Sequence, residues 1–595
     1  MTDTPAALPR HAPDFARLAG AAAAVLWLVF CLAWFDVAAP WRPGFVAALP
    51  RLVWLLPLAL AAAFWLRGRG RLLAGEPLGE SRPALWLVLA LAFCFRLPTV
   101  LAGAGATVTP DGALSGIVAL HARDGLQRLV FVPNVPYSGS LKSHLTAPLA
   151  LVLDPAVAFA LVSALFYLAF VAGLYRLALL VAGPRSALLS GLYAAFSPAF
   201  VTRYSLSNDG NYVEVLALGT WALWLAARWT REHASRPQLA FAAGLLLGLG
   251  FWCHILAVIY LAAIALLFAL AGRFASLRSL LSLAAGWAIG YAPGWLWNLA
   301  NGWESFGYLL PGVARTRGGV TGVAVMTTGL AEKVWLMLTD HGPALMGYDP
   351  GYGSALDRAL LALAWLGVFA ALIAVGHAAR RAMREGLRTA PRHGEGGWPL
   401  AALLIFTVTN IGIALLALPH VPGNPRYILF LMSVIPVFLA DAFGTGPLWP
   451  RRFLLSVLIA TGAVASIAQV PPTLEQDARW RGFVSELERA GVRHCYTDFF
   501  LATRINFLSS ERVVCSAKLG PFTTEYFFAY REAVERAPEA ALIPVNRTAA
   551  SRLEKRLTEL GVAYERRDLL KPVLLRLSRK VDPKEIFPWR DLPPR

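Results

Sequence analysis

The sequence predicts an α-helical polytopic membrane protein of about thirteen transmembrane helices, followed by a small C-terminal α/β domain. Three observations support this class. Of the 595 residues, 57% are hydrophobic and only 15% are charged, and apolar runs long enough to cross a bilayer recur along the chain. Helices are expected because a segment in the hydrocarbon core must satisfy its own backbone hydrogen bonds.

The expected spans are apolar runs bounded by polar or turn-forming residues. They lie at residues 18–38, 51–66, 84–102, 155–181, 186–202, 211–229, 239–253, 255–271, 279–299, 359–378, 399–418, 427–443 and 453–470. The pair at 239–271 is also compatible with one long kinked element. No convincing signal-peptide cleavage site precedes the first run, so we expect it to remain as an uncleaved span.

Basic clusters indicate the orientation of these spans. With the spans counted as above, the clusters fall on one side, which the positive-inside rule makes cytoplasmic; they lie at 67–82, 228–236, 380–388 and 451–452. The loops 103–154, 203–212, 300–358 and 419–426 then face outward. We expect a multi-pass inner-membrane protein with a cytoplasmic N-terminus, an extracytoplasmic C-terminal domain, and membrane lipids rather than nucleic acid as its partners.

Three parts are expected along the chain: an N-terminal tail with two extra helices (1–83), a transmembrane domain (84–470) and an outer domain (471–595). In the last part, helical patterns alternate with short β-branched runs, which predicts an α/β domain. Cys495 and Cys515 fall near the ends of two predicted strands there. An oxidising compartment favours a disulfide between them, and two buried free thiols are the alternative.

The segment "TVTPDGALSGIVALHARDGLQ" (107–127) contains a candidate catalytic residue, Asp111. Thr109, Pro110 and Asp111 read as the N-cap, N1 and N2 positions of a helix, where a carboxylate favours the helix dipole. A capping role alone would explain Asp111. Apolar residues then recur at helical spacing, opposite polar ones, which predicts a helix lying in the membrane interface; the apolar residues are Leu114, Ile117 and Val118, and the polar ones are Arg123 and Gln127.

Further polar residues are expected on the same side of the membrane. They are Tyr137, Lys142, His144, Arg203, Asp209, His254, His341, His420 and Arg426. Each alone is explained by solvation at the end of a span. Together with Asp111 they would form a pocket of carboxylates and cations, which suits a reaction that needs a base for a hydroxyl and cations for a phosphate leaving group.

Two stretches carry a resemblance to a known family. "TPDGALSGIVAL" and "VPYSGSLKSHLTAPLALVLD" resemble the first outer loop of GT-C membrane glycosyltransferases, particularly the protein-O-mannosyltransferase and aminoarabinose-transferase branch. A Tyr-x-Gly-Ser-Leu motif of bacterial relatives is matched by Tyr137, Gly139, Ser140 and Leu141. The segments "GFWCHILAVIY", "GYAPGWLWNLANGWESF", "NPRYILFL" and "YTDFFLATRINFLSSERVV" are also similar, so the resemblance covers roughly residues 84–520.

The resemblance implies an activity. Such enzymes move a sugar from a polyprenyl-phosphate donor to an acceptor hydroxyl on the outer face of the membrane, with inversion, and a loop aspartate is the general base. Asp111 is the matching position. The sequence departs from the family at Gly112, where a glutamate is usual, and at Lys142, where many relatives also carry glutamate. Asp209 stands where other members have a second acid, although "SNDGN" also reads as an Asx turn.

The remaining site expectations concern the donor. Lys142, Arg203 and Arg426 are the candidate phosphate-binding cations, and Arg426 is also explained as an arginine that snorkels from a span end. Tyr137 and His254 are expected in the substrate pocket, with a packed histidine as the alternative for His254. Some GT-C enzymes need a divalent cation, but no dense spacing of ligands in this sequence requires one.

Two other functions remain open from the sequence. A transporter or flippase of lipid-linked sugars would favour ionisable residues inside spans and an internal repeat, whereas the ionisable residues lie mainly at span ends and no repeat is visible. A non-enzymatic envelope protein would leave Asp111 as a helix cap. The acceptor, whether lipid, glycan or protein, cannot be read from the sequence.

Overall fold

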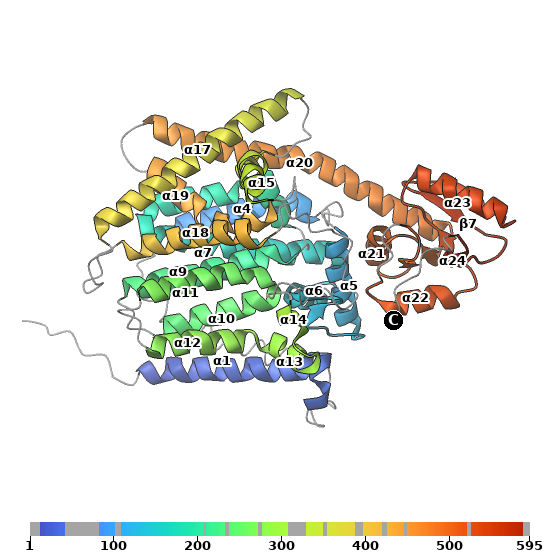
Figure 1. Ribbon diagram of the computed structural model, residues 1–595, viewed down its shortest axis with the longest axis horizontal. Coiled ribbons are helices and arrows are strands. Elements are labelled where there is room, and N and C mark those ends of the chain that lie inside the picture. Colours follow the sequence, from blue (N-terminus) through green and yellow to red (C-terminus); the bar gives the residue numbers. More distant parts are fainter. Residues whose placement is uncertain are drawn as a thin grey trace, which may run out of the picture.

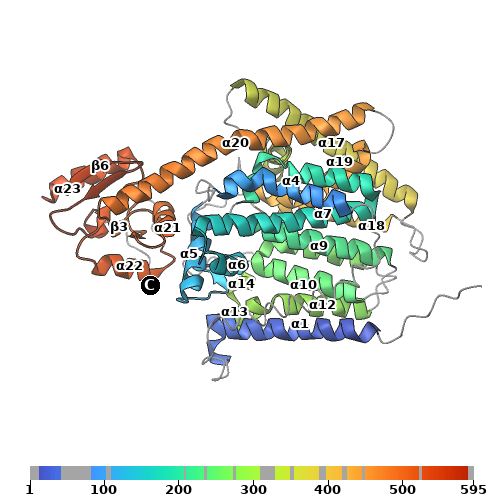
Figure 2. The ribbon, with the colours of Figure 1, turned by 180° about the vertical axis from the view of Figure 1, so that it is seen from behind.

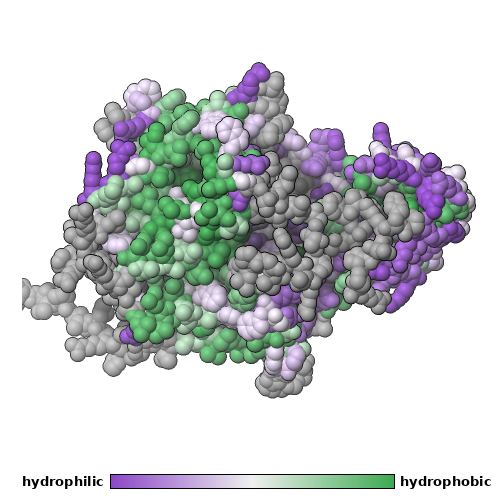
Figure 3. Space-filling view, viewed as in Figure 1, coloured by the Kyte–Doolittle hydropathy of each residue, from purple (hydrophilic) through white to green (hydrophobic). Residues whose placement is uncertain are grey.

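The protein consists of a bundle of long helices and a small α/β domain at one end of it (Figure 1). This computed structural model describes residues 12–41, 82–101, 109–206, 210–232, 237–271, 277–307, 329–348, 354–386, 397–418, 425–444, 449–520 and 525–586. Figure 3 shows apolar side chains over the visible face of the bundle, whereas hydrophilic residues gather on the C-terminal domain and at the opposite edge. The predicted fold class is confirmed.

Most of the bundle helices lie side by side (Figures 1 and 2). They are α1 (Ala12–Trp34), α4 (Arg82–Leu101), α7 (Pro155–Ala195), α9 (Tyr212–Arg231), α10 (Pro237–Cys253), α11 (Val258–Leu270), α12 (Leu277–Gly290), α17 (Ser354–Glu385), α18 (Trp398–Ala417), α19 (Ile435–Gly444) and α20 (Trp449–Arg489). Among the described residues, five helices are long and apolar enough to cross a membrane, or up to six if one bent pair is a single span. The predicted span 51–66 lies outside the described residues.

Proline and glycine interrupt several of the expected spans. α7 covers the expected spans 155–181 and 186–202 and breaks between them, as predicted, at Gly183, which has a φ of 84° and precedes Pro184. The second half of α7 ends at Ala195, and a short helix, α8 (Ala199–Tyr204), begins only after Pro198. Proline lacks an N–H and disfavours a helical residue before it, which explains these breaks.

Two more expected spans are also broken. The span expected at 279–299 is divided into α12 and α13 (Ala292–Ala300), with Pro293 in the first turn of α13. The span expected at 427–443 is a 3-10 helix, η8 (Arg426–Ser433), that meets α19 at an angle of 47°. Hydropathy therefore located the apolar segments correctly and missed these breaks.

The tightest helix contact in the bundle joins α10 and α12 through glycines spaced four residues apart on each helix. A Cβ atom built at Gly248 would lie 2.2 Å from the carbonyl oxygen of Trp287, and one at Gly290 would lie 2.3 Å from that of Leu245. Side chains larger than hydrogen are therefore excluded at this crossing. Small residues allow backbones in a membrane to approach closely and gain van der Waals contact.

We predict that Gly290→Leu destabilises the bundle by about 3 kcal/mol or more, because the side chain would force the two backbones apart. Gly412→Leu on α18 is the matched control, since a Cβ there meets nothing within 4 Å. Thermal unfolding of the detergent-solubilised proteins measures both. An equal effect of the two substitutions would contradict the close packing of α10 and α12.

The two ends of the bundle differ in composition. The end that carries the C-terminal domain, called the domain end below, also carries the first outer loop, with α5 (Pro110–Asp124), β1 (Phe131–Val132), β2 (Val135–Gly139) and α6 (Leu141–Leu149). At the far end, Arg231 donates to the carbonyl of Leu180 at 3.4 Å, and Arg381 donates to the carbonyl of Val181 at 3.2 Å. Two of the basic clusters used to orient the chain therefore lie at the same end.

Helix α20 connects the bundle to the C-terminal domain (Figure 2). Its 41 residues run without interruption through Pro471 and Pro472, so the change of composition at 471 is not accompanied by a break in the helix. Beyond the prolines, Arg481 bridges Asp477 at 3.0 Å and Asp154, the N-cap of α7, at 3.1 Å. The helix is thereby tied to the bundle near the point where the domain begins.

The C-terminal domain has a five-stranded sheet of order β4-β3-β5-β7-β6. The first three strands in this order are parallel and the last two add an antiparallel hairpin; the strands are β3 (His494–Tyr496), β4 (Val514–Ser516), β5 (Ala541–Leu542), β6 (Glu565–Asp568) and β7 (Pro572–Leu575). The helices are α21 (Phe499–Leu508), α22 (Phe528–Arg536), α23 (Arg547–Glu559) and α24 (Pro583–Ile586). This arrangement is the α/β domain that the alternating pattern predicted.

The two cysteines of this domain form a disulfide. Cys495 and Cys515 are register partners on the neighbouring strands β3 and β4, and their Cα atoms are 4.4 Å apart. The pairing expected for an oxidising compartment is therefore confirmed, and the alternative of two free thiols is wrong.

Thiol counting provides a direct test of this disulfide. We expect alkylation of the denatured, unreduced protein to label only Cys31, Cys94 and Cys253, the free cysteines. Reduction should add Cys495 and Cys515 to the labelled set, as read by peptide mass mapping. Labelling of either residue before reduction would contradict the bond.

Candidate active site

Asp111 lies in the first turn of α5, at the domain end. Thr109 is the N-cap, and its hydroxyl oxygen accepts a hydrogen bond from the N–H of Gly112 at 3.0 Å. Pro110 occupies the first helical position and Asp111 follows it with an exposed side chain. The predicted cap is confirmed, and the Asp111 carboxylate is accessible as well as favourably placed for the helix dipole.

The predicted surroundings of α5 were wrong. An interfacial helix with one polar, solvated face was expected, but every residue from Gly112 to Ala122 is buried. On one side the Ser143 hydroxyl of α6 donates to the carbonyl of Ser115 at 2.8 Å. On the other side the apolar stripe, which contains Leu114, Ile117 and Val118, packs into the core of the C-terminal domain rather than against lipid.

Specific contacts hold α5 against the C-terminal domain. A Cβ at Gly116 would lie 2.4 Å from the ring of Phe507, so the absence of a side chain at Gly116 leaves room for this ring. Nε2 of His121 lies 2.8 Å from Oε1 of Glu511, which also accepts the hydroxyl of Tyr530 at 2.5 Å. Burial opposes ionisation of Glu511, but these hydrogen bonds outweigh it and hold the pKa of its carboxyl below the usual value.

Lys142 forms a buried ion pair with Glu214, a residue that sequence reasoning missed. Nζ of Lys142 lies 3.1 Å from Oε1 of Glu214, and the two side chains are 1% and 0% exposed. The ring of Phe159 lies 5.5 Å from the ammonium group. The signal was available, because an acidic residue near the start of an apolar span is costly and usually has a function.

A second group of side chains, called the aromatic–arginine cluster below, consists of Tyr137, Tyr204, Tyr212, His254 and Arg426. The ring of His254 lies 5.6 Å from that of Tyr137 and 5.2 Å from that of Tyr212. The rings of Tyr204 and Tyr212 are 5.3 Å apart. Arg426 interacts electrostatically with both of these tyrosines. Burial, and then the charge of Arg426, lower the pKa of His254, so this histidine is neutral at physiological pH.

The cluster is assembled from segments that are distant in the sequence. Tyr137 lies on β2, and its neighbour Ser138 forms an isolated β-bridge with His254, which follows the last residue of α10. Nδ1 of His254 accepts the N–H of Leu256 and so starts a single 3-10 turn. Tyr212 begins α9 and Arg426 begins η8. The cluster thus lies where several helices begin or end.

A buried histidine ties α1 to α6 beside this site. The indole N–H of Trp34 donates to Nδ1 of His144 at 3.1 Å, and Nε2 of His144 lies 2.8 Å from the carbonyl of Leu129. Burial lowers the pKa of His144 to about 4, so the neutral ring donates through Nε2 and accepts through Nδ1. The first of the two helices expected as an N-terminal addition is therefore packed directly on the outer-loop structure.

The structure brings together some of the predicted site residues and not others. Tyr137, His254 and Arg426 share the aromatic–arginine cluster. Lys142 lies in α6 and is paired with Glu214, while the next residue, Ser143, contacts α5 at Ser115. Arg203 is exposed on α8 beside Tyr204, and Asp209 lies outside the described residues. In the described part of the chain, no group of three or more His, Cys, Asp or Glu side chains is arranged to hold a metal ion.

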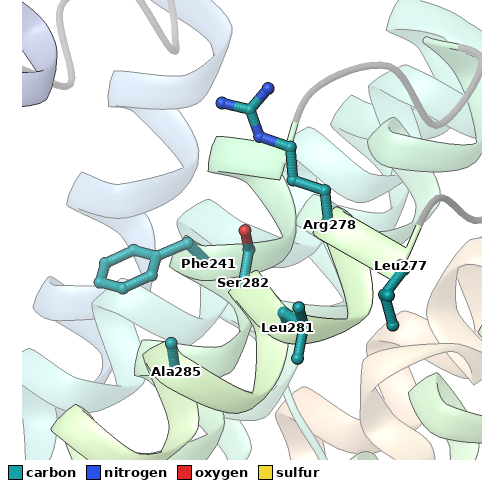
Figure 4. A pocket seen from close by; sticks show the side chains of 6 residues that line it. All are labelled: Phe241, Leu277, Arg278, Leu281, Ser282 and Ala285. Atoms are coloured by element: carbon teal, nitrogen blue, oxygen red, sulfur yellow. The ribbon is translucent and has the colours of Figure 1, made fainter.

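A hollow of about 510 Å³ elsewhere in the bundle is not part of this site (Figure 4). It lies between α10 and α12 and is lined by Phe241, Leu277, Arg278, Leu281, Ser282 and Ala285. Phe241 is near the start of α10, whereas His254 follows the end of that helix. Leu277 and Leu281 are 71% and 60% exposed, so the hollow opens on the apolar surface of the bundle.

Comparisons with known proteins bear on the class of this site. Residues 145–297 match the dolichyl-phosphate-mannose-protein mannosyltransferase family. The structure of ArnT from Cupriavidus metallidurans in the apo state aligns with a TM-score of 0.52 at 11% identity, covering 82% of this chain and 97% of that chain. The same protein bound to undecaprenyl phosphate aligns with a TM-score of 0.51 at 11% identity, covering 84% and 98%.

The chain has the fold of GT-C membrane glycosyltransferases, and a part of it matches a mannosyltransferase family. The family match supports the glycosyltransferase class, and the likeness to ArnT shows the GT-C fold over most of the chain. The resemblance drawn from the first outer loop is thereby confirmed. The apo oligosaccharyltransferase of Archaeoglobus fulgidus also aligns, with a TM-score of 0.43 at 13% identity, covering 77% of this chain and 69% of that chain. A search of curated proteins finds no match.

The Lys142–Glu214 pair gives a stability prediction. We expect Glu214→Gln to cost about 3–5 kcal/mol of unfolding free energy, because it leaves a buried ammonium group without its carboxylate. The double variant Lys142→Met/Glu214→Gln should recover most of the loss. Thermal unfolding of the single and double variants, compared in a mutant cycle, measures these changes in stability.

An exposed pair serves as the control. The Arg536–Glu532 pair has side chains that are 79% and 51% exposed, and Glu532→Gln should change stability by about 0.5 kcal/mol or less. A double variant no more stable than Glu214→Gln would contradict the charge pairing as the source of the loss.

Proposed function

We propose that this chain transfers a sugar from a polyprenyl-phosphate donor to an acceptor hydroxyl at the outer face of the membrane, with Asp111 as the general base. The observation that carries this proposal is the gathering at one end of the bundle of an accessible carboxylate, a buried Lys142–Glu214 pair and an arginine held among tyrosines. ArnT, which has the same fold, has been solved with undecaprenyl phosphate bound. The matched family is named for a dolichyl-phosphate-mannose donor.

Arg426 is the principal candidate for binding the donor phosphate. Its guanidinium presents a planar set of N–H donors that suits a phosphate group. Its neighbours in the cluster are tyrosines and a histidine, so no carboxylate of the cluster competes with the phosphate. Lys142 has its charge balanced by Glu214, and Arg203 lies exposed on the neighbouring helix; both are candidates for a second phosphate contact.

The proposed reaction is a single displacement with inversion. The Asp111 carboxylate accepts the proton of the acceptor hydroxyl while the hydroxyl oxygen forms a bond to the anomeric carbon. The bond between that carbon and the phosphate oxygen breaks, and the phosphate leaves on its polyprenyl chain. Arg426 stabilises the negative charge that develops on the leaving phosphate. Asp209 is a candidate second acid, and no step of this scheme depends on a divalent cation.

The proposed orientation follows from two features of the described residues. Basic clusters lie at the far end of the bundle, as expected for a cytoplasmic face. The C-terminal domain contains a disulfide, which suits an oxidising compartment outside the cytoplasm. Both features support an active site and a C-terminal domain on the outer side of the inner membrane, where a lipid, a glycan or a protein would be the acceptor.

The test of this function is transfer by the purified protein in lipid nanodiscs. Undecaprenyl-phosphate sugars are supplied with lipid, glycan or peptide acceptors, and released undecaprenyl phosphate is measured. We expect Asp111→Asn to lower turnover by about 100-fold or more, because it removes the base. The same change should cost about 1 kcal/mol of stability or less and leave donor binding intact, because asparagine preserves the shape of the helix start.

Asp124→Asn at the other end of α5 is the matched control. Asp124 is also an exposed carboxylate of this helix, and its replacement should leave transfer unchanged. Near-normal transfer by Asp111→Asn would reduce Asp111 to a helix cap and remove the proposed mechanism. A wild-type protein that releases no undecaprenyl phosphate from any of these donors would overturn the proposed function itself.

A further inference from the structure

The side chain of Asn211 joins segments that carry the aromatic–arginine cluster. Its Nδ2 lies 2.5 Å from the carbonyl oxygen of Gly139, 3.0 Å from that of Cys253 and 3.1 Å from the hydroxyl of Ser138. The residue is 2% exposed. One amide group therefore connects β2, the end of α10 and the start of α9.

The acceptors of the Asn211 amide lie close together because the backbone of β2 contacts the backbone at the end of α10. A Cβ at Gly139 would lie 2.1 Å from the carbonyl oxygen of Trp252. The neighbouring bridge between Ser138 and His254 keeps the strand and the helix end in register. Buried carbonyl groups need a donor, and the amide of Asn211 donates to those of Gly139 and Cys253.

The backbone of Asn211 has a second requirement. Its φ of 53° is in the left-handed region, which asparagine tolerates better than most residues other than glycine. α9 starts at the next residue, Tyr212, which belongs to the cluster, and its first turn contains Glu214. Asparagine combines the left-handed backbone with a buried donor, whereas glycine would supply only the first.

We propose that Asn211 is a positioning residue of the active site. It touches no substrate itself; its amide sets β2 and the His254 turn against the start of α9, and so places Tyr137, Tyr212 and His254 around Arg426. This inference rests on the proposed function for its effect on transfer. Small misplacements of binding groups lower rates strongly, and we expect a loss of about 10- to 100-fold in kcat/KM without the amide donor.

The experiment compares Asn211→Asp with Asn298→Asp. Both wild-type side chains are buried amides that donate to several acceptors: Asn298 is 0% exposed, and its Nδ2 lies 2.8 Å from the carbonyl oxygen of Gly294 and 2.6 Å from the hydroxyl of Ser305. None of those partners belongs to the segments that Asn211 joins. Similar losses of thermal stability are expected, whereas kcat/KM should fall only in Asn211→Asp.

Asn211→Gly separates the side chain from the backbone. It keeps the left-handed conformation and removes the donor, so it should fold and still lose about 10- to 100-fold in kcat/KM. Wild-type transfer by Asn211→Gly would overturn the proposal, since the backbone alone would then arrange the site. An equal loss of kcat/KM in Asn298→Asp would also overturn it, because the effect would be one of general stability.

Amide hydrogen exchange gives a readout that does not depend on activity. Residues 135–144 and 250–256 should exchange faster in both Asn211 variants and not in Asn298→Asp. If wild-type protein transfers no sugar, the proposed function falls, and the inference is then decided by this exchange together with the affinity for undecaprenyl phosphate. Faster exchange with weaker binding supports the positioning role, and unchanged exchange or unchanged affinity overturns it.

Discussion

The packing of α5 between the bundle and the C-terminal domain is the contact on which the rest of the active site depends. The helix begins at Pro110, one residue before Asp111, and is buried on both sides, by α6 and by the core of the C-terminal domain. A carboxylate in the first turn of an isolated amphipathic helix would move with the loop that carries it. Because Phe507 packs against Gly116 and Glu511 binds His121, the C-terminal domain fixes the position of the helix that carries Asp111.

The membrane imposes the second constraint, which is visible in where the helices end. The end of a helix leaves backbone carbonyl groups without partners in the helix, and α10 ends at Cys253, beside the aromatic–arginine cluster. The amide of Asn211 donates to the carbonyl of Cys253 there and to that of Gly139 on β2. The side chain that supplies hydrogen bonds to these buried carbonyl groups therefore also holds the segments of the cluster together.

Much of this architecture is predictable from sequence because it depends on local pattern. Apolar runs located the spans, the order Thr-Pro-Asp located the cap of α5, and alternating patterns located the α/β domain with its paired cysteines. The partner that covers the apolar stripe of α5 was not predictable. Periodicity shows that one face of a helix is buried, but it does not show which element buries it. Glu214 and Tyr212 were missed for a related reason: their importance comes from Lys142 and His254, which are distant in sequence and meet them only in the fold.

Lys142 and Arg426, both at the domain end, differ in how their charges are compensated. Lys142 and Glu214 are both fully buried and compensate each other, so the pair is neutral as a unit and removing either charge alone is costly. Arg426 is only partly buried, and its described neighbours are aromatic rather than acidic, so its charge is available to an anion. In the proposed reaction the donor phosphate binds Arg426 at the start of η8 and the base is Asp111 at the start of α5, so the leaving group and the base are held by different helices.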